Sequence, residues 1–177
     1  LETIRGYCLM AQIRYRLGNY VEALAQADKA HDMAQRLIGQ KPMNIVRRQY
    51  VYEAARIKSL TAIIYCMQGK YLSAIPLNKL ALATFREYGD LLNQAVVLMN
   101  LGNTFNEIGE FKKALRYYDR SLNIKRRIGD LYGQGNTLHN ISKALGMLGY
   151  HKRALQHSEQ GLEISRRIGD ISGVATS

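Results

Sequence analysis

LLNQAVVLMNLGNTFNEIGEFKKALRYYDRSLNIKRRIGD, residues 91–130, is followed without a gap by LYGQGNTLHNISKALGMLGYHKRALQHSEQGLEISRRIGD, residues 131–170. The two stretches carry the same residue at 15 of their 40 positions, including the whole ending Arg-Arg-Ile-Gly-Asp. Chance would give only a few such matches, so one unit has been duplicated. Because internal repeats of roughly 20–50 residues are typical of repeat architectures, this duplication decides how the rest of the chain is interpreted.

The same register extends toward the N-terminus. Residues 51–90 form a third copy that also ends in Gly-Asp, and Gly69, Gly109 and Gly149 keep the 40-residue spacing. A more divergent copy fills the first 40 residues. We therefore predict one repeat domain over residues 1–177, which we expect to be a fragment of a longer chain, with repeats at about 1–40, 41–90, 91–130 and 131–170 and the start of a further helix at 171–177.

Each repeat has the pattern of two helices joined by a glycine. In residues 91–108 and again in residues 111–128, apolar residues recur three or four positions apart, which gives a helix one apolar face. Gly109 stands between the two stretches, where a residue without Cβ strain can end one helix and turn into the next. One hairpin cannot bury both apolar faces, so we predict an all-α solenoid of stacked hairpins.

The second repeat departs from this register in two places. Residues 41–50 are an insertion without glycine, so we predict a long first helix from about Met43 to Met67. Pro76 stands inside the second helix of this repeat, and it lacks an N–H. It therefore predicts a local kink or a late helix start.

Composition and motifs argue against several classes of protein. Hydrophobic residues make up 47% of the chain, too many for a disordered tail, and no apolar run approaches the roughly 18 residues of a membrane helix. Cys8, Cys66 and the four histidines show no metal-ligand spacing, so we expect no metal and no cofactor. No nucleophile, phosphate-loop or paired-carboxylate motif stands out, so we expect no enzymatic activity. The few cysteines favour a reducing compartment, and we expect a cytoplasmic protein.

A set of positions recurs from repeat to repeat, which the third repeat supplies as Leu98, Leu101, Gly102, Phe105, Gly109, Phe111, Ala114, Tyr118 and Ser121. This pattern resembles the tetratricopeptide repeat family. The 40-residue length exceeds the usual ~34 residues and is similar to that of repeats in bacterial signalling and transcription-regulator proteins. The resemblance implies a right-handed α-solenoid that binds a protein or peptide. Lys58 departs from the pattern, because it stands where a large apolar residue is expected.

In the tetratricopeptide repeat family, the first helix of each repeat has an outer face, which points away from the core. This face lines a concave groove. The resemblance therefore implies a peptide-binding groove formed by Asn100, Asn103, Asn140, Lys143, His139, Met99, Glu107, Arg56 and Ile63. Asn100 and Asn140 are equivalent positions one repeat apart, and an Asn amide offers donors and an acceptor to the backbone of an extended peptide. The alternative interpretation is polar surface inherited by duplication.

The net charge of +11 is compatible with an acidic partner and also with simple solubility. A basic run on the second helix of the third repeat comprises Lys112, Lys113, Arg116, Arg120, Lys125, Arg126 and Arg127. No known nucleic-acid-binding module accompanies it, so we interpret it as a solvated face with helix-end charges.

Three function hypotheses follow from the sequence. The leading one is a protein- or peptide-binding scaffold or sensory module of a larger regulatory protein. The first alternative is a self-association module that holds its own chain in a homo-oligomer. The second is a basic solenoid that binds nucleic acid, which the lack of a known nucleic-acid-binding module disfavours. None of them involves a membrane.

Overall fold

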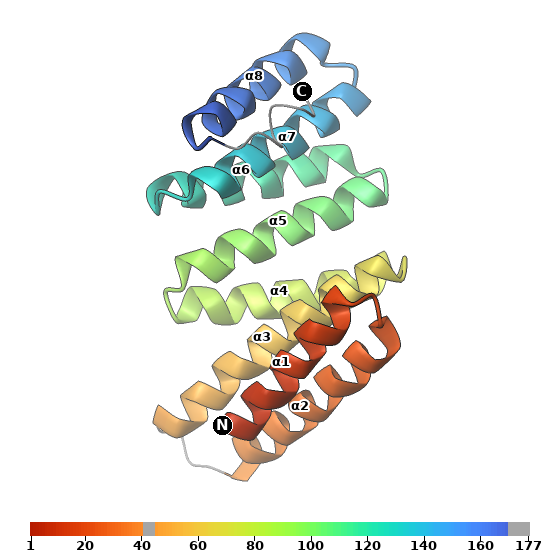
Figure 1. Ribbon diagram of the computed structural model, residues 1–177, viewed down its shortest axis with the longest axis vertical. Coiled ribbons are helices and arrows are strands. Elements are labelled where there is room, and N and C mark those ends of the chain that lie inside the picture. Colours follow the sequence, from red (N-terminus) through yellow and green to blue (C-terminus); the bar gives the residue numbers. More distant parts are fainter. Residues whose placement is uncertain (41–44, 170–177) are drawn as a thin grey trace. The chain divides into compact units, whose positions relative to one another are not determined.

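The computed structural model describes residues 1–40 and 45–169, and in these ranges the chain forms helices joined by short turns (Figure 1). The helices are α1 (Glu2–Arg16), α2 (Tyr20–Gln40), α3 (Ile45–Met67), α4 (Tyr71–Glu87), α5 (Leu91–Glu107), α6 (Phe111–Arg127), α7 (Leu131–Met147) and α8 (His151–Arg167). Consecutive helices pair as the hairpins α1–α2, α3–α4, α5–α6 and α7–α8. The prediction of an all-α fold of stacked helical hairpins is confirmed.

The chain divides into two compact halves, Leu1–Asp90 and Leu91–Ser177, and each half contains two hairpins. In the N-terminal half, α2 of the first hairpin packs against α3 of the second. In the C-terminal half, α6 packs against α7 in the same way. The first helices also touch within each half, α1 with α3 and α5 with α7.

The long first helix predicted for the second repeat is confirmed from Ile45 to Met67, whereas residues 41–44 lie outside the described residues. The late helix start predicted at Pro76 is wrong, because α4 begins at Tyr71 and continues through the proline. The further helix expected at 171–177 also lies outside the described residues.

The hairpin turns are built around glycine, as Gly109 illustrates. Its φ is +77°, a conformation that a residue with a Cβ rarely adopts. The Gly109 N–H donates to the Asn106 carbonyl at 3.0 Å, and the Glu110 N–H donates to the Phe105 carbonyl at 2.9 Å. This pair of bonds satisfies the last carbonyls of α5 and stops the helix.

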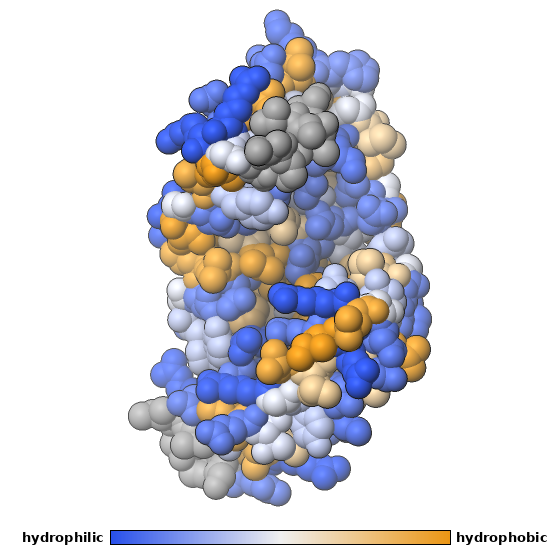
Figure 2. Space-filling view, in the orientation of Figure 1, coloured by the Kyte–Doolittle hydropathy of each residue, from blue (hydrophilic) through white to orange (hydrophobic). Residues whose placement is uncertain are grey.

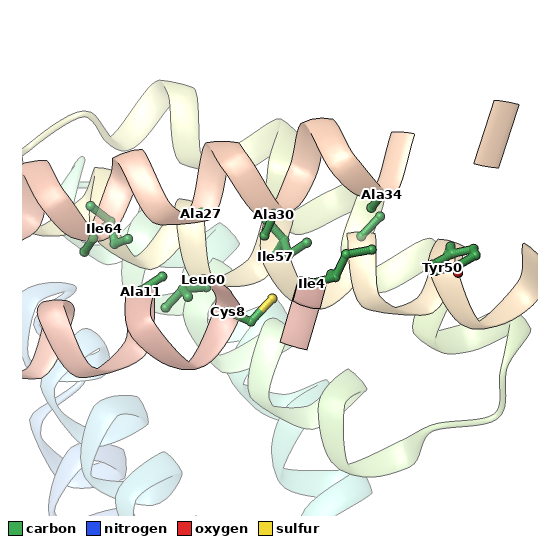
Figure 3. Close-up of a cluster of buried hydrophobic side chains, with 12 residues drawn as sticks. Ile4, Cys8, Ala11, Ala27, Ala30, Ala34, Tyr50, Ile57, Leu60 and Ile64 are labelled. Carbon is green, nitrogen blue, oxygen red and sulfur yellow. The ribbon is translucent and has the colours of Figure 1, made fainter. Parts of the chain in front are cut away.

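The core of the N-terminal half combines small residues on α2 with larger ones on its neighbours. Figure 3 shows side chains from α1, α2 and α3 meeting there: Ile4, Cys8, Ala11, Ala27, Ala30, Ala34, Tyr50, Ile57, Leu60 and Ile64. The alanines let α2 approach the other helices closely. Burial, followed by the charge of Glu53, raises the pKa of the Cys8 thiol to about 11. Cys8 therefore stays protonated and acts as a small apolar residue.

In the C-terminal half, the contact between α5 and α6 depends on Gly102. A Cβ built on Gly102 would lie 2.4 Å from two ring carbons of Tyr118, which is far inside van der Waals contact. Beside this contact, the Ser121 hydroxyl donates to the Ala95 carbonyl at 2.7 Å. The absence of a side chain at position 102 thus makes room for the largest buried ring of this half.

We predict opposite effects for the same substitution at two glycines of this half. Gly102→Ala should lower the free energy of unfolding by about 1–3 kcal/mol, because the added methyl group collides with Tyr118. Gly146→Ala in α7 is the control: nothing lies within 4 Å of its Cβ, so it should raise stability by up to about 1 kcal/mol. Urea unfolding measures both, and equal effects at the two positions would contradict the close α5–α6 contact.

Candidate functional site

On α5 and α7, two of the predicted groove residues are hydrogen-bonded to each other. The Asn140 Nδ2 donates to the Asn103 Oδ1 at 3.1 Å. The Tyr118 hydroxyl donates to the same oxygen at 2.9 Å. Because the oxygen accepts both bonds, the orientation of the Asn103 amide is set by its surroundings.

These bonds use one atom of each amide group and leave one nitrogen and one oxygen without a bond. In the part of the chain that the structure describes, the Asn103 Nδ2 and the Asn140 Oδ1 have no hydrogen-bond partner, and neither is a buried atom. Each is therefore open to solvent. The pair presents outward the same two kinds of group that a peptide backbone needs, an N–H donor and a carbonyl acceptor.

The Tyr118 phenol, which donates to Asn103, stays in its protonated form. Burial, and secondarily the negative charge of Glu107, raises the pKa of the Tyr118 phenol well above its usual range. The phenol therefore keeps its proton across the physiological range and always donates to Asn103. The Asn103–Asn140 pair is thus supported from the core of the hairpin, by a side chain that is itself buried.

The other predicted groove residues of the C-terminal half differ in exposure. Glu107, His139 and Lys143 are exposed, whereas Met99 is half-buried. The Asn100 Nδ2 is buried and has no partner among the described residues. Asn140 therefore pairs with Asn103 and not with Asn100, its own equivalent in the preceding repeat.

Lys125 corrects the interpretation of the basic run, because this lysine is buried and only 2% exposed. Its Nζ donates to the Thr137 hydroxyl at 2.9 Å, the Gly133 carbonyl at 3.1 Å and the Met99 sulfur at 3.2 Å. Burial lowers the pKa of Lys125, and the charge of Asp130 opposes this effect. Lys125 therefore joins α6 to α7 from within, and it is not part of a solvated basic face.

In the N-terminal half, the predicted residue Arg56 belongs to a charged cluster around the buried carboxylate of Glu53. The Arg56 NH1 lies 2.9 Å from one carboxylate oxygen, and the Arg5 Nε lies 2.8 Å from the other. Sequence reasoning missed Arg5. Aligning Gly18 with Gly69 would have found it, because that alignment places Arg5 and Arg56 at the same repeat position.

A pocket of about 290 Å³ lies beside this cluster and is lined by Arg5, Arg48, Gln49, Tyr52, Glu53 and Tyr88. The Arg48 guanidinium lies 5.3 Å from the centre of the Tyr88 ring, and the Tyr88 hydroxyl donates to the Arg48 carbonyl at 2.7 Å. Arg48 and Gln49 stand on the extra N-terminal turns of α3 that come from the insertion. The remaining predicted groove residue, Ile63, is half-buried on the same helix.

Within the described ranges, no three His, Cys, Asp or Glu side chains are grouped so that they could hold a metal ion. A search of the same residues finds no helix that is both long enough and apolar enough to cross a membrane.

Comparisons with known proteins give one family match and several structural matches. The profile described as "Tetratricopeptide repeat" matches residues 53–127 and 109–167, which together cover more than half of the chain. No curated protein matches the sequence.

The structural matches extend over nearly the whole chain. Aspartyl phosphate phosphatase F from Bacillus subtilis matches 99% of the chain with a TM-score of 0.87 and 16% identity. The apo form of RapI matches 96% of the chain with a TM-score of 0.84 and 17% identity. The Rap conjugation gene regulator of plasmid pLS20, in complex with the Phr* peptide, matches 99% of the chain with a TM-score of 0.79 and 18% identity. At these identities the likeness shows the fold alone, and the chain spans only 43%, 58% and 45% of the three proteins.

We predict that the aliphatic part of Lys125 matters more for stability than its charge. Lys125→Met keeps the buried stem, and the Gly133 carbonyl still accepts from the Thr137 hydroxyl, so stability should stay within about 1 kcal/mol of the parent. Lys125→Ala should cost about 2–3 kcal/mol because it leaves a cavity. Urea unfolding of the two variants tests this, and an equal loss in both would show that the Nζ bonds dominate.

Proposed function

Because the chain belongs to the tetratricopeptide repeat family, we propose that it binds a segment of another protein on the outer faces of its first helices. The observation that carries the proposal is the Asn103–Asn140 pair, which bridges α5 and α7 and leaves a donor and an acceptor open to solvent. Such groups recognise a peptide backbone irrespective of its side chains. The chain would serve as a binding or sensory module of a larger regulatory protein.

The charges around the pair favour an acidic ligand group. Lys143 and His139 are exposed on α7, and Glu107 is the exposed acid on α5. Packed helices lie roughly 8–10 Å apart, and an extended peptide rises about 3.3 Å per residue. A peptide crossing from α5 to α7 would therefore place about three residues between them, with its backbone on the asparagines and an acidic side chain or C-terminus near Lys143.

The N-terminal half offers a second contact of the same chemistry. Arg5 and Arg56 approach Glu53 from the surface, with side chains that are 56% and 40% exposed. Three arginines, Arg5, Arg48 and Arg56, surround the single buried carboxylate of Glu53. This half would therefore also favour an acidic side chain, which agrees with the net charge of +11.

The structural matches support a role in peptide binding without establishing one. One of the similar structures is described as a gene regulator in complex with a peptide. The fold of the chain is thus one on which a peptide complex has formed. Because the chain spans less than two thirds of these proteins, any output of the full-length protein is a separate question.

We predict that Asn103→Ala combined with Asn140→Ala lowers the affinity for an extended peptide about tenfold, since each lost hydrogen bond is worth about 0.5–1.5 kcal/mol. Peptides would first be selected from a random display library on the parent chain, and their Kd measured by calorimetry. Asn123→Ala, an exposed asparagine on α6, is the matched control and should bind like the parent. Circular dichroism checks that the double variant is folded. A folded double variant that binds its peptides at full strength would refute the assignment of this face.

An apolar stripe on α1 favours self-association as a second candidate function. Its residues are Leu9, Met10, Ile13 and Leu17, with exposures of 57, 42, 44 and 72%. In Figure 2 a band of apolar atoms crosses the surface where Figure 1 shows α1. At the repeat positions equivalent to Met10 and Ile13, Thr61 and Ile64 of α3 are buried. The stripe on α1 is therefore the kind of face that takes a neighbouring hairpin inside this chain.

The self-association hypothesis predicts a dimer whose formation depends on this stripe. Light scattering should then give twice the chain mass for the parent and the single mass for Ile13→Lys, because a charge in an apolar interface is costly. Lys29→Ala, an exposed change on α2, should leave the dimer intact. A parent that is monomeric at high concentration would rule out this second function.

A further inference from the structure

A second pocket of the N-terminal half lies among α2, α3 and α4, away from the arginine-lined pocket. Its volume is about 230 Å³. Ile57, Pro76 and Leu77 supply its apolar wall. Because α2 belongs to the first hairpin and α4 to the second, anything bound here would contact both hairpins.

The pocket contains a lysine at a position where the C-terminal half has leucine. Lys58 is equivalent to Leu98 and Leu138, which are both only 1% exposed. A corresponding hollow between α6, α7 and α8 has Leu138 at this position, and its charged lining residues are Arg126, Glu159 and Glu163. The exchange of leucine for lysine therefore places an amino group at a position that holds a buried leucine in the next two repeats.

The basic groups of the pocket lack partners. In the described part of the chain, Lys58 makes no ion pair and no side-chain hydrogen bond, and the His31 Nδ1 is buried without a partner. Burial lowers the pKa of Lys58. Burial, followed by the charge of Lys58, lowers the pKa of His31, whereas the charges of Asp32 and Asp28 oppose this shift. Such an arrangement would be relieved by an anion between them.

The charges of Asp28 and Asp32 act on His31, but among the described residues neither forms an ion pair with it. Asp28 lines the pocket, but it forms no ion pair with Lys58 or His31 within 4.0 Å among the residues described. Burial, and then the negative charge of Asp32, raises the pKa of Asp28. The hydroxyl groups of Thr61 and Ser73 also face the pocket, and each can donate one hydrogen bond to an anion.

We propose that this pocket binds a small molecule with one anionic group on a short apolar chain. The anionic group would lie at Lys58 and His31, and the apolar chain would lie on Ile57, Pro76 and Leu77. A water molecule occupies about 30 Å³ in the liquid, so the pocket has room for roughly eight of them. That is enough for a short-chain carboxylate and too little for a nucleotide. This site is distinct from the peptide-binding faces of the first helices, and neither proposal depends on the other.

The proposal is tested with butyrate as the probe, in an NMR titration of the ¹⁵N-labelled 177-residue chain. Butyrate should shift the amide signals of residues 57–65 and 73–77, which border the pocket. Butanamide has nearly the same shape without the charge, and it should bind at least about tenfold more weakly, because a hydrogen bond to a charged group is the stronger kind. Inorganic phosphate, which lacks the apolar chain, should also bind more weakly than butyrate.

Lys58→Met separates binding from folding. It removes the charge and restores a large apolar side chain, so the variant should melt at or above the temperature of the parent and still lose butyrate binding about tenfold or more. Lys79→Met is the matched control, because Lys79 is an exposed lysine of α4 that does not line the pocket. It removes the same charge from the same half and should leave butyrate binding unchanged.

Three results would overturn the proposal. The first is no localised shift with butyrate. The second is an equal loss of binding in Lys58→Met and Lys79→Met, which would reduce the effect to general attraction by a chain of net charge +11. The third is tighter binding of a glutamate blocked at both ends than of butyrate, which would assign the pocket to an acidic side chain of a protein partner.

Discussion

The packing of a second helix against the first helix of the next hairpin is the constraint on which each half depends. A helical hairpin has two apolar faces and can bury only one of them internally, so the other must be covered by a neighbour. Between α6 and α7 this packing is joined by polar bonds in both directions. The Lys125 Nζ donates to the Gly133 carbonyl, and the Gln134 Nε2 donates to the Lys125 carbonyl at 3.3 Å. These bonds, together with that from the Lys125 Nζ to the Thr137 hydroxyl, fix the register of the two helices.

The same constraint decides which surface is available for the proposed binding. Some residues of each first helix pack against the preceding and following helices. The residues on its outer face are not needed for this packing. Polar side chains can accumulate there at little cost to the core. The Asn103–Asn140 pair lies at the border of the core. The Asn103 Oδ1 accepts from the Tyr118 hydroxyl and the Asn140 Nδ2, whereas the Asn103 Nδ2 remains open. A face of this kind is rigid before a ligand arrives, which lowers the entropic cost of binding.

The helices and their pairing could be predicted from the sequence because the signals are local. The recurring glycines mark turns, the three-to-four spacing marks helices, and the repeat sets the order of the hairpins. Partners across helices could not be read in this way. In the sequence Lys125 belongs to a basic helix end, and only the packing of α6 on α7 buries its Nζ against neutral oxygens and a sulfur. Asn100 and Asn103 are only three residues apart on one helix, and tertiary packing decides which of them meets Asn140.

Repetition also explains why single exchanges can create sites in this fold. Position 85 of the second repeat is a buried Phe, and its equivalents are the buried Lys125 and the half-buried Ser165. Position 58 is Lys where the next two repeats have buried leucines. The backbone at such positions is held by neighbours on both sides, so a side chain of different chemistry changes the local environment without changing the hairpin. Buried positions that differ between repeats are therefore as informative about function as exposed positions that agree, because their chemistry is not explained by the needs of the scaffold.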